Sequence, residues 1–301
     1  MQTECICAKI KNMNELKEKA YAKLNISLDV KEAREDGFHD MEMIMQTVSL
    51  SDDISIRLSE DGEVKSTCNA SYIPNDDRNL AVRAAKLFFS AAGLEKTGAF
   101  ISIKKKIPVG AGMAGGSADA AAVLRALNRH FGFLFSQEKM LELAGKLGSD
   151  VPFCLIGGTA LARGRGEILD RISPLPECAF AICKPEFSVS TPELFRALDG
   201  IKMRSHPDTA GMLKAFEEGS LDRICRRMYN VFEDVPDRRM RTIAEIKSRI
   251  LDGGAKGAVM TGTGSAVFGI FKDLHSAEAI CSKMKKEYGF CCASVPVGNL
   301  L

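Results

Sequence analysis

The sequence predicts an α+β protein built from two lobes. Stretches with strand and helix patterns alternate irregularly, which favours mixed layers over a doubly wound parallel sheet. The chain has 301 residues, enough for one large domain or two ordinary ones. Pro174 and Pro176 lie in residues 170–177, which carry neither pattern. We therefore place the boundary there and expect lobes at residues 1–172 and 173–301.

The first lobe opens with a strand at residues 21–30. Its two faces differ in character, because apolar and polar residues alternate along it: Leu24, Ile26, Leu28 and Val30 against Lys23, Asn25, Ser27 and Asp29. Residues 1–12 show no matching pattern, and we expect a disordered leader there. The other predicted elements are strands at 41–50 and 54–58, a helix through Leu80 to Ala91 capped by Asp76 or Asp77 and ended by Gly93, a strand around Ile101 and Ile103, and helices at 118–130 and 137–147.

The second lobe is predicted to begin with a strand at residues 179–183. Helical patterns follow, and the chain then returns to strands around a glycine turn. The expected elements are helices at 191–198, 209–217 and 237–251, strands at 257–260 and 266–271, a helix at 276–288 and a last strand at 291–296.

Composition excludes several classes of protein. Hydrophobic residues make up 46% of the chain and charged residues 27%, as in ordinary globular proteins. The 41 basic and 39 acidic residues leave a net charge of +2, too balanced to indicate a nucleic-acid or membrane surface. The basic run at residues 104–106 is interpreted as a solvated strand end. No apolar run approaches the roughly 18 residues that span a bilayer.

The ten cysteines show no CxxC pairs at metal-binding spacing. Since the start of the sequence lacks the apolar core of a signal peptide, reduced and mostly buried thiols are expected. We therefore expect a cytoplasmic protein and assign the cysteines no catalytic role.

A glycine loop at residues 108–117 carries the main functional signal. It joins a predicted strand to an alanine-rich helix, and its glycines let the backbone N–H groups approach a ligand. The helix adds the positive end of its dipole, so the loop is predicted to cradle phosphate. The residues expected to bind the nucleotide are Pro108, Val109, Gly110, Ala111, Gly112, Met113, Ala114, Gly115, Gly116, Ser117 and Ala118.

Two better-known phosphate motifs match this loop less well. Gly110, Gly112 and Gly115 spell G-x-G-x-x-G, but the acidic residue that a dinucleotide site needs about 20 positions later is missing. The nearest, Glu138, opens a predicted helix instead. Gly116 stands where a Walker loop needs its lysine.

The pattern P-x-G-x-G-[LM]-x-G-[GS]-S resembles the ATP loop of the GHMP kinases, which act on galactose, homoserine, mevalonate and phosphomevalonate. Phe38 stands where a tyrosine is usual, and Met113-Ala114 replaces a commoner Leu-Gly, a change expected to be tolerated only if φ of Ala114 is negative. From about Lys19 to the C-terminus, further blocks narrow the resemblance to one branch: residues 22–26, 34–39, 45–50, 148–153, 157–160, 164–167, 189–191 and 260–265.

The resemblance implies the fold and the reaction. It implies an N-terminal lobe like domain 2 of ribosomal protein S5 and a ferredoxin-like C-terminal lobe. It implies that Mg-ATP phosphorylates the 2-hydroxyl of 4-diphosphocytidyl-2-C-methyl-D-erythritol in the non-mevalonate isoprenoid pathway. The partner is then this small molecule, and we expect a monomer or weak homodimer. Mg²⁺ is expected to be held by phosphates and water, with Ser117 as a candidate contact and no dedicated protein ligand set.

The same resemblance assigns a catalytic pair. Asp150 is implied to be the general base that takes the proton of the attacking hydroxyl. From the residues alone, Asp150 could equally cap a short helix, because Pro152 follows two positions later. Lys23 is implied to lie beside Asp150, keep it ionised and stabilise the charge on the transferred phosphoryl group.

The remaining implied site residues bind the acceptor. His39 resembles a cytosine-binding residue, and Phe38 and Phe187 are expected to stack on the base. The resemblance also assigns Asn25 and Thr191 to the acceptor. A second glycine turn at Gly262 and Gly264 is implied to support the phosphate site, although a plain hairpin fits its sequence too.

Three alternatives remain open at this stage. Another GHMP kinase acting on homoserine, mevalonate or a sugar would not need the aromatic residues of a nucleotide-stacking site. A silent binding protein on the same fold would not need both Lys23 and Asp150. A dinucleotide-dependent oxidoreductase is disfavoured by the missing acidic residue.

Overall fold

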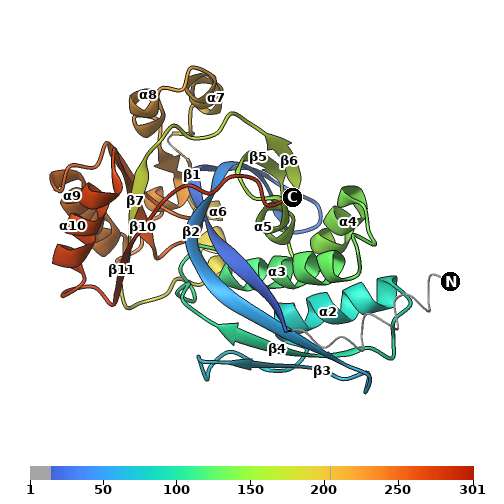
Figure 1. The fold of residues 1–301 in the computed structure, drawn as a ribbon. Helices are drawn as coiled ribbons and strands as arrows, with labels where there is room; N and C mark the ends of the chain where they lie inside the picture. The colour runs from blue at the N-terminus through green and yellow to red at the C-terminus, as the bar shows by residue number, and fades with distance from the viewer. Residues whose placement is uncertain (1–14, 204) are drawn as a thin grey trace.

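Two β-sheets organise the chain, and the computed structural model describes residues 15–203 and 205–301 (Figure 1). The leader expected at residues 1–12 lies outside the described residues. Strands and helices alternate irregularly between the two sheets, so the predicted α+β class with two lobes is confirmed.

The larger sheet has seven strands. Its order is β3-β4-β2-β1-β8, with β5 paired to β2 and β6 paired to β5. All of its strands except β8 come from residues 16–171: β1 Leu16–Ala33, β2 His39–Ser59, β3 Val64–Cys68, β4 Gly98–Lys104, β5 Thr159–Gly164, β6 Ile168–Arg171 and β8 Tyr229–Asn230.

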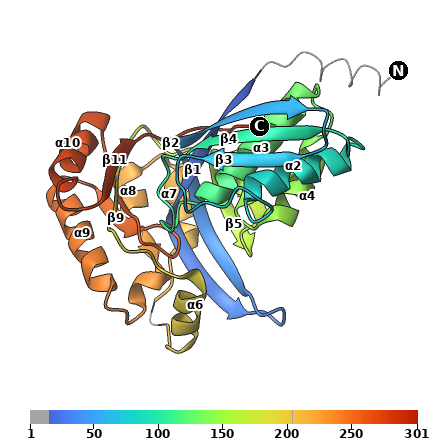
Figure 2. The same ribbon diagram turned by 90° about the horizontal axis from the view of Figure 1, so that it is seen from below.

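Four helices lie against one face of this sheet: α2 Leu80–Ala91, α3 Gly115–His130, α4 Gln137–Leu147 and α5 Val151–Ile156 (Figures 1 and 2). The alanines of α3 are fully buried, which lets the helix pack closely between β1 and α2. The cap of α2 is Asn79, whose side chain accepts the Ala81 N–H, rather than the predicted Asp76 or Asp77. Asp76 instead pairs with Arg78.

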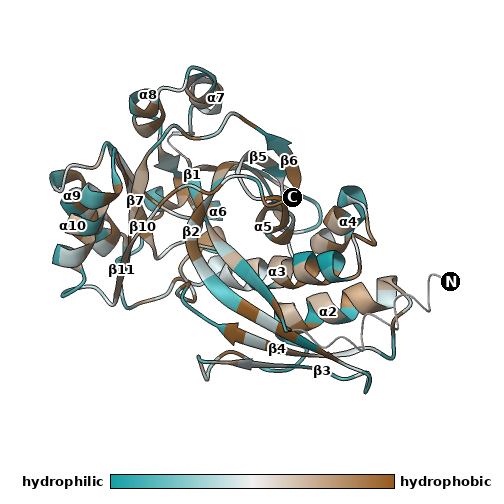
Figure 3. Ribbon diagram, viewed as in Figure 1, coloured by the Kyte–Doolittle hydropathy of each residue, from teal (hydrophilic) through white to brown (hydrophobic). Residues whose placement is uncertain are grey.

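The smaller sheet has the order β11-β7-β10-β9 and is antiparallel throughout: β7 Ala179–Lys184, β9 Gly257–Met260, β10 Val267–Phe271 and β11 Phe290–Ser294. Its two packed helices, α9 Met240–Asp252 and α10 Leu274–Met284, turn apolar sides to the sheet and hydrophilic sides outward (Figure 3). This chain order and strand order match the β-α-β-β-α-β arrangement of ferredoxin-like domains. Three further helices, α6 Thr191–Asp199, α7 Thr209–Glu217 and α8 Leu221–Cys225, lie between β7 and β9 along the chain with the 3₁₀ turn Val231–Asp234.

One predicted break between strands is wrong. The strands expected at residues 41–50 and 54–58 form a single strand, β2, because Asp52 and Asp53 remain within the ladder with β1. Asp52 accepts hydrogen bonds from the backbone N–H groups of Lys106 and Ile107, at 2.5 and 2.8 Å. Because these hydrogen bonds satisfy the buried carboxylate, the strand does not need a turn that would expose Asp52 to water.

Candidate active site

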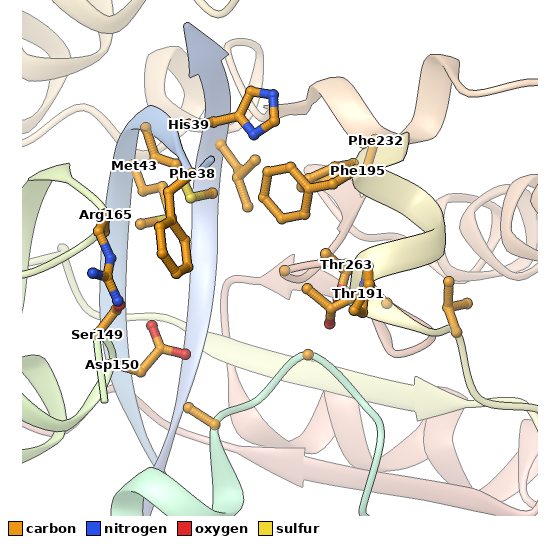
Figure 4. Close-up of a pocket in the computed structure, with 18 of the residues that line it drawn as sticks. Phe38, His39, Met43, Ser149, Asp150, Arg165, Thr191, Phe195, Phe232 and Thr263 are labelled. Carbon is orange, nitrogen blue, oxygen red and sulfur yellow. The ribbon is translucent and has the colours of Figure 1, made fainter. Parts of the chain in front are cut away.

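A cavity of about 810 Å³ lies between the β1–β2 hairpin, the glycine loop and α6 (Figure 4). It brings together most of the residues that the sequence indicated: Lys23, Phe38, His39, Gly110, Gly112, Ala114, Ser117, Asp150, Thr191, Gly262 and Gly264. The other predicted site residues do not line the cavity. The cavity therefore combines the backbone of a glycine loop, titratable side chains and aromatic rings in one space.

The glycine loop joins β4 to α3 and turns backbone toward the cavity. Gly110 and Gly112 have φ of 63° and 72°, values that favour glycine. The side chains of Ala111 and Met113 point into the core, so these residues can offer a ligand only their backbone. Pro108, Val109, Gly115, Gly116 and Ala118 complete the loop but do not line the cavity.

Ala114 does not have the negative φ that the sequence led us to expect. Its φ is 56° and its ψ is 34°, in the left-handed region, at the N-cap of α3. The loop keeps this geometry because the next residue must already enter the helix. Alanine here carries a steric cost that the commoner glycine would avoid.

The second glycine turn packs directly against the first. A Cβ added at Gly112 would lie 2.1 Å from the Thr261 carbonyl oxygen, and one added at Gly262 would lie 2.8 Å from the Gly112 carbonyl oxygen. The Thr261 hydroxyl donates to the Gly112 carbonyl at 3.3 Å and accepts the Asn25 N–H at 3.0 Å. The turn between β9 and β10 therefore packs on the glycine loop from the second lobe and is more than a plain hairpin.

Lys23 and Asp150 meet at the floor of the cavity. The Lys23 Nζ lies 3.9 Å from the Asp150 Oδ2, with the lysine side chain 5% exposed and the aspartate side chain 34% exposed. Lys23 also donates to the Asn25 Oδ1 at 2.6 Å. Asn25 itself is fully buried and does not line the cavity, so it holds Lys23 rather than facing a ligand.

Asp150 precedes α5 but does not cap it. Its φ and ψ are already helical, and its side chain makes no hydrogen bond to the first turn. The carboxylate is directed into the cavity instead (Figure 4). The helix-capping alternative for this side chain is therefore wrong, and the carboxylate is available for proton transfer.

Aromatic rings form the opposite end of the cavity. The His39 ring stacks on Phe195 at a centroid distance of 5.1 Å, and its Nε2 lies 2.7 Å from the Asp199 Oδ1. Phe38 lies beside His39, 49% exposed, with its ring turned into the cavity (Figure 4). These residues come from the start of β2 and from α6, so α6 closes this end.

Phe187, expected to stack on a base, does not line the cavity. It packs against the core of the second lobe, and its carbonyl accepts hydrogen bonds from the Lys184 Nζ at 3.0 Å and the Ser265 Oγ at 2.6 Å. Phe195 faces the cavity instead, because α6 turns that ring toward His39. Phe195 lies within the helix predicted at residues 191–198, but the sequence pattern did not indicate which side of that helix faces the site.

Comparison with known proteins agrees with this geometry. The sequence model of the GHMP kinases N-terminal domain matches residues 79–158, and that of the GHMP kinases C-terminal domain matches residues 212–289. A 4-diphosphocytidyl-2-C-methyl-D-erythritol kinase of Clostridium botulinum (strain Eklund 17B / Type B) is 44% identical over 270 residues, which cover 90% of this chain and 96% of that protein. The chain belongs to the GHMP kinases.

Other GHMP kinases resemble this chain as well. A 4-diphosphocytidyl-2-C-methyl-D-erythritol kinase of Caldicellulosiruptor saccharolyticus is 44% identical over 267 residues, 89% of this chain and 92% of that protein. A crystal structure of 4-(cytidine 5'-diphospho)-2C-methyl-D-erythritol kinase superposes with a TM-score of 0.78 and 31% identity, covering 94% of this chain and 100% of that one. Homoserine kinase from Cytophaga hutchinsonii, at 21% identity and a TM-score of 0.75 over 96% of each chain, shares the fold.

A second lysine centre lies beneath the glycine loop of this GHMP kinase. Lys105 Nζ contacts Asp52 Oδ2 at 2.5 Å and Asp119 Oδ2 at 2.8 Å, and all three side chains are at most 6% exposed. The same Nζ would lie 3.1 Å from a Cβ added at Gly115, so it supports the end of the loop. The prediction of a solvated strand end at residues 104–106 is therefore wrong for Lys105, since two buried carboxylates surround it.

Two carboxylates share one ammonium in this centre. Burial raises the pKa of Asp119 to about 7; Lys105 opposes the shift, and the neighbouring Asp52 adds to it. One oxygen of Asp119, Oδ1, is buried without a hydrogen-bond partner among the described residues. The two carboxylates oppose the effect of burial on Lys105 and raise its pKa. Sequence reasoning missed this centre because its three members lie on β2, after β4 and on α3.

Within the described residues, no group of three or more His, Cys, Asp or Glu side chains could hold a metal ion, and no helix is long and apolar enough to cross a bilayer. The eight described cysteines are free thiols. Burial raises the pKa of Cys154, Cys178 and Cys225 to about 12, which makes them poor nucleophiles.

Proposed function

We propose that this GHMP kinase transfers the γ-phosphate of ATP to the 2-hydroxyl of 4-diphosphocytidyl-2-C-methyl-D-erythritol, in the non-mevalonate isoprenoid pathway. The observation that carries the proposal is the cavity itself, where the Lys23–Asp150 pair faces the glycine loop at one end and aromatic rings lie at the other. Relatives that match nearly the whole chain carry the name of this kinase.

Asp150 acts as the general base in this proposal. It accepts the proton of the acceptor hydroxyl as the oxygen attacks the γ-phosphorus, and its partial exposure leaves room for that hydroxyl. The Lys23 ammonium lies 3.9 Å from the Asp150 carboxylate. It also offsets the negative charge on the transferred phosphoryl group, because its Nζ is directed by Asn25 toward the reacting end.

The glycine loop binds the phosphates of ATP. Backbone N–H groups around Gly110 and Gly112 and the N-terminus of α3 supply the positive field that a triphosphate requires. Mg²⁺ bound with ATP would neutralise part of the phosphate charge. We expect this ion to be held mainly by phosphate and water, with Ser117, which lines the cavity, as a candidate protein contact.

The acceptor's cytosine lies at the aromatic end of the cavity. Phe38 and Phe195 offer stacking faces from β2 and α6, and Phe195 takes the role that the sequence had suggested for Phe187. The His39 ring, held by Asp199, presents its polar edge to the base. Thr191, whose hydroxyl lies 2.9 Å from that of Thr263, borders the middle of the cavity.

The organisation beyond the site follows the same proposal. We propose domains at residues 1–172 and 173–301, since every strand of the larger sheet except β8 falls in the first range. A cytoplasmic location suits an enzyme whose described cysteines are free thiols. A monomer or weak homodimer remains our prediction for the assembly.

ADP release with Mg-ATP tests the function directly. The cytidyl diphosphate acceptor is compared with mevalonate, homoserine and galactose, with Asp150→Asn in parallel. We expect turnover with the cytidyl compound alone and a loss of at least about 10²-fold in kcat in the variant, because the base is removed while its shape is kept. Turnover with a different alcohol would move the substrate, and ATP binding without any turnover would favour a silent binding protein.

A further inference from the structure

Arg165 lies between the two ends of the cavity. Its guanidinium carbon is 3.9 Å from the centroid of the Phe38 ring, a close cation–π contact. Figure 4 shows the side chain running along the wall from Phe38 toward Ser149 and Asp150. It thus spans the distance between the aromatic end and the reacting end.

The backbone holds this arginine in place. Arg165 lies in the tight turn between β5 and β6, where Gly164 and Gly166 have φ of 68° and 113°. The Arg165 N–H donates to the Glu167 Oε2 at 2.7 Å, which fixes the turn. Gly166 is buried, and a Cβ there would lie 3.2 Å from the end of the Met43 side chain, so the turn packs on β2. The side chain therefore starts from a rigid position.

The charge of Arg165 has no ion-pair partner within the described part of the chain. Its neighbour Arg163, two residues earlier, pairs with Asp170 at the surface. Arg165 acts electrostatically on Asp36, whose pKa is lowered mainly by the Phe38 N–H, with smaller effects from Arg34 and Arg165. Asp36 is already bound by Arg34 at 3.2 Å. A half-buried guanidinium in a cavity without its own carboxylate is suited to bind an anion.

We propose that Arg165 binds the diphosphate of the acceptor and thereby determines its specificity for a nucleoside diphosphate. The inference rests on the proposed function. An acceptor with its base against Phe38 and its hydroxyl at Asp150 must run its diphosphate along the wall that Arg165 occupies. A guanidinium carries five N–H donors, more than its contact with one ring engages, so donors remain for phosphate oxygens.

The same contact supports the ring of Phe38. The guanidinium covers one face of the ring and leaves the other for the base. Arg165 is therefore both a ligand of the diphosphate and a support for the stacking residue. The two roles differ in what they predict, since only the first depends on phosphate in the ligand.

Calorimetric binding of CDP and of cytidine separates these roles. We compare the wild-type chain with Arg165→Met, which keeps length and apolar contact with Phe38 but removes the charge. Arg165→Lys keeps the charge without the planar fork, and Arg163→Met is the matched control on the same hairpin. We expect Arg165→Met to weaken CDP binding 10- to 100-fold and cytidine binding no more than about 3-fold, with Arg165→Lys between wild type and Arg165→Met. Arg163→Met should bind both ligands as wild type does.

Kinetics with the complete acceptor provide the second readout. We expect Arg165→Met to raise the KM for the acceptor by a factor similar to its loss of CDP affinity and to leave the KM for ATP within about 2-fold. Equal losses for cytidine and CDP, or unchanged CDP binding, would overturn the diphosphate role while the proposed function stands. Absence of CDP and cytidine binding in the wild-type chain, together with no turnover, would overturn the proposed function and this inference with it.

Discussion

Two buried lysines in this chain face aspartates, and the two centres differ in distance and exposure. Lys23 and Asp150 are 3.9 Å apart, and Asp150 is one-third exposed to the cavity. Lys105 contacts Asp52 and Asp119 at 2.5 and 2.8 Å, and the three are almost completely enclosed. In the first pair the carboxylate can be reached from the cavity, whereas in the second both carboxylates are enclosed.

The difference separates catalysis from support. A loose pair with an open carboxylate can accept a proton, because the base must reach the substrate and not only its partner. A closed centre with two carboxylates on one ammonium fixes three segments, β2, α3 and the chain between β4 and the glycine loop. Both lie close to the glycine loop, so residue type alone does not distinguish them.

Replacing each lysine by methionine is the strongest test of this distinction. For Lys23→Met we expect kcat to fall on the order of 10³-fold, with the free energy of unfolding changed by no more than about 1 kcal/mol. For Lys105→Met we expect the free energy of unfolding to fall by about 3–5 kcal/mol, because two adjacent buried carboxylates lose their cation. Urea denaturation and steady-state ADP release measure the two quantities.

Lys106→Met is the matched control for the second centre. Lys106 pairs with Asp53 at 2.8 Å but is 44% exposed, so its loss should cost under about 1 kcal/mol. Its backbone N–H still donates to Asp52 in the variant. The distinction would fail if Lys23→Met destabilised the fold as much as Lys105→Met does, or if both variants kept full activity.

The sequence predicted the open pair, Lys23 and Asp150, but not the closed centre of Lys105, Asp52 and Asp119. Lys23 and Asp150 lie in blocks that resemble a family, so their roles came with the resemblance. Lys105 lies in a basic run that is typical of an exposed strand end. Its burial depends on Asp52 and Asp119, which approach it only once β2 and α3 have packed together. No local pattern records such a tertiary contact.

At the acceptor end of the cavity, too, the sequence did not predict which side chains the tertiary structure brings together. Phe187 and Phe195 are equally aromatic, and only the orientation of α6 decides that Phe195 stacks with His39. Arg165 lay in a block that resembles the family but was given no role, since nothing in sequence places it over Phe38. The helix periods and glycine turns were predictable because they depend on neighbouring residues, as the match of α4 and β9 with their predicted bounds illustrates.

The second-largest predicted effect is a pH dependence of stability, and it comes from Asp119, one of the two carboxylates that share the Lys105 ammonium. With its pKa raised from 3.8 to about 7, Asp119 binds a proton more readily in the folded chain than in the unfolded one. Between about pH 4 and pH 7 the folded state therefore holds more protons, and its free energy of unfolding falls as pH rises. We expect Asp119→Asn to remove this decline, which amounts to on the order of 1 kcal/mol per pH unit.

Urea denaturation of both chains across about pH 5 to 8 checks this expectation. The difference in free energy of unfolding between Asp119→Asn and wild type should grow with pH up to about 7 and then level off. A difference that stays constant over this range would mean that Lys105 keeps both carboxylates charged.

The smallest predicted change in stability concerns Ala114, in the glycine loop that both centres border. Ala114 adopts a left-handed conformation at the N-cap of α3, a place where glycine is preferred to alanine. We expect Ala114→Gly to raise the free energy of unfolding by about 0.5–1 kcal/mol, since relief of the steric cost exceeds the added entropy of the unfolded chain. Ala118→Gly, on the helical and buried part of α3, should instead lower it by about 1 kcal/mol. Opposite signs in urea denaturation would attribute the gain to the left-handed backbone, whereas a loss in both variants would show that the loop tolerates Ala114 without strain.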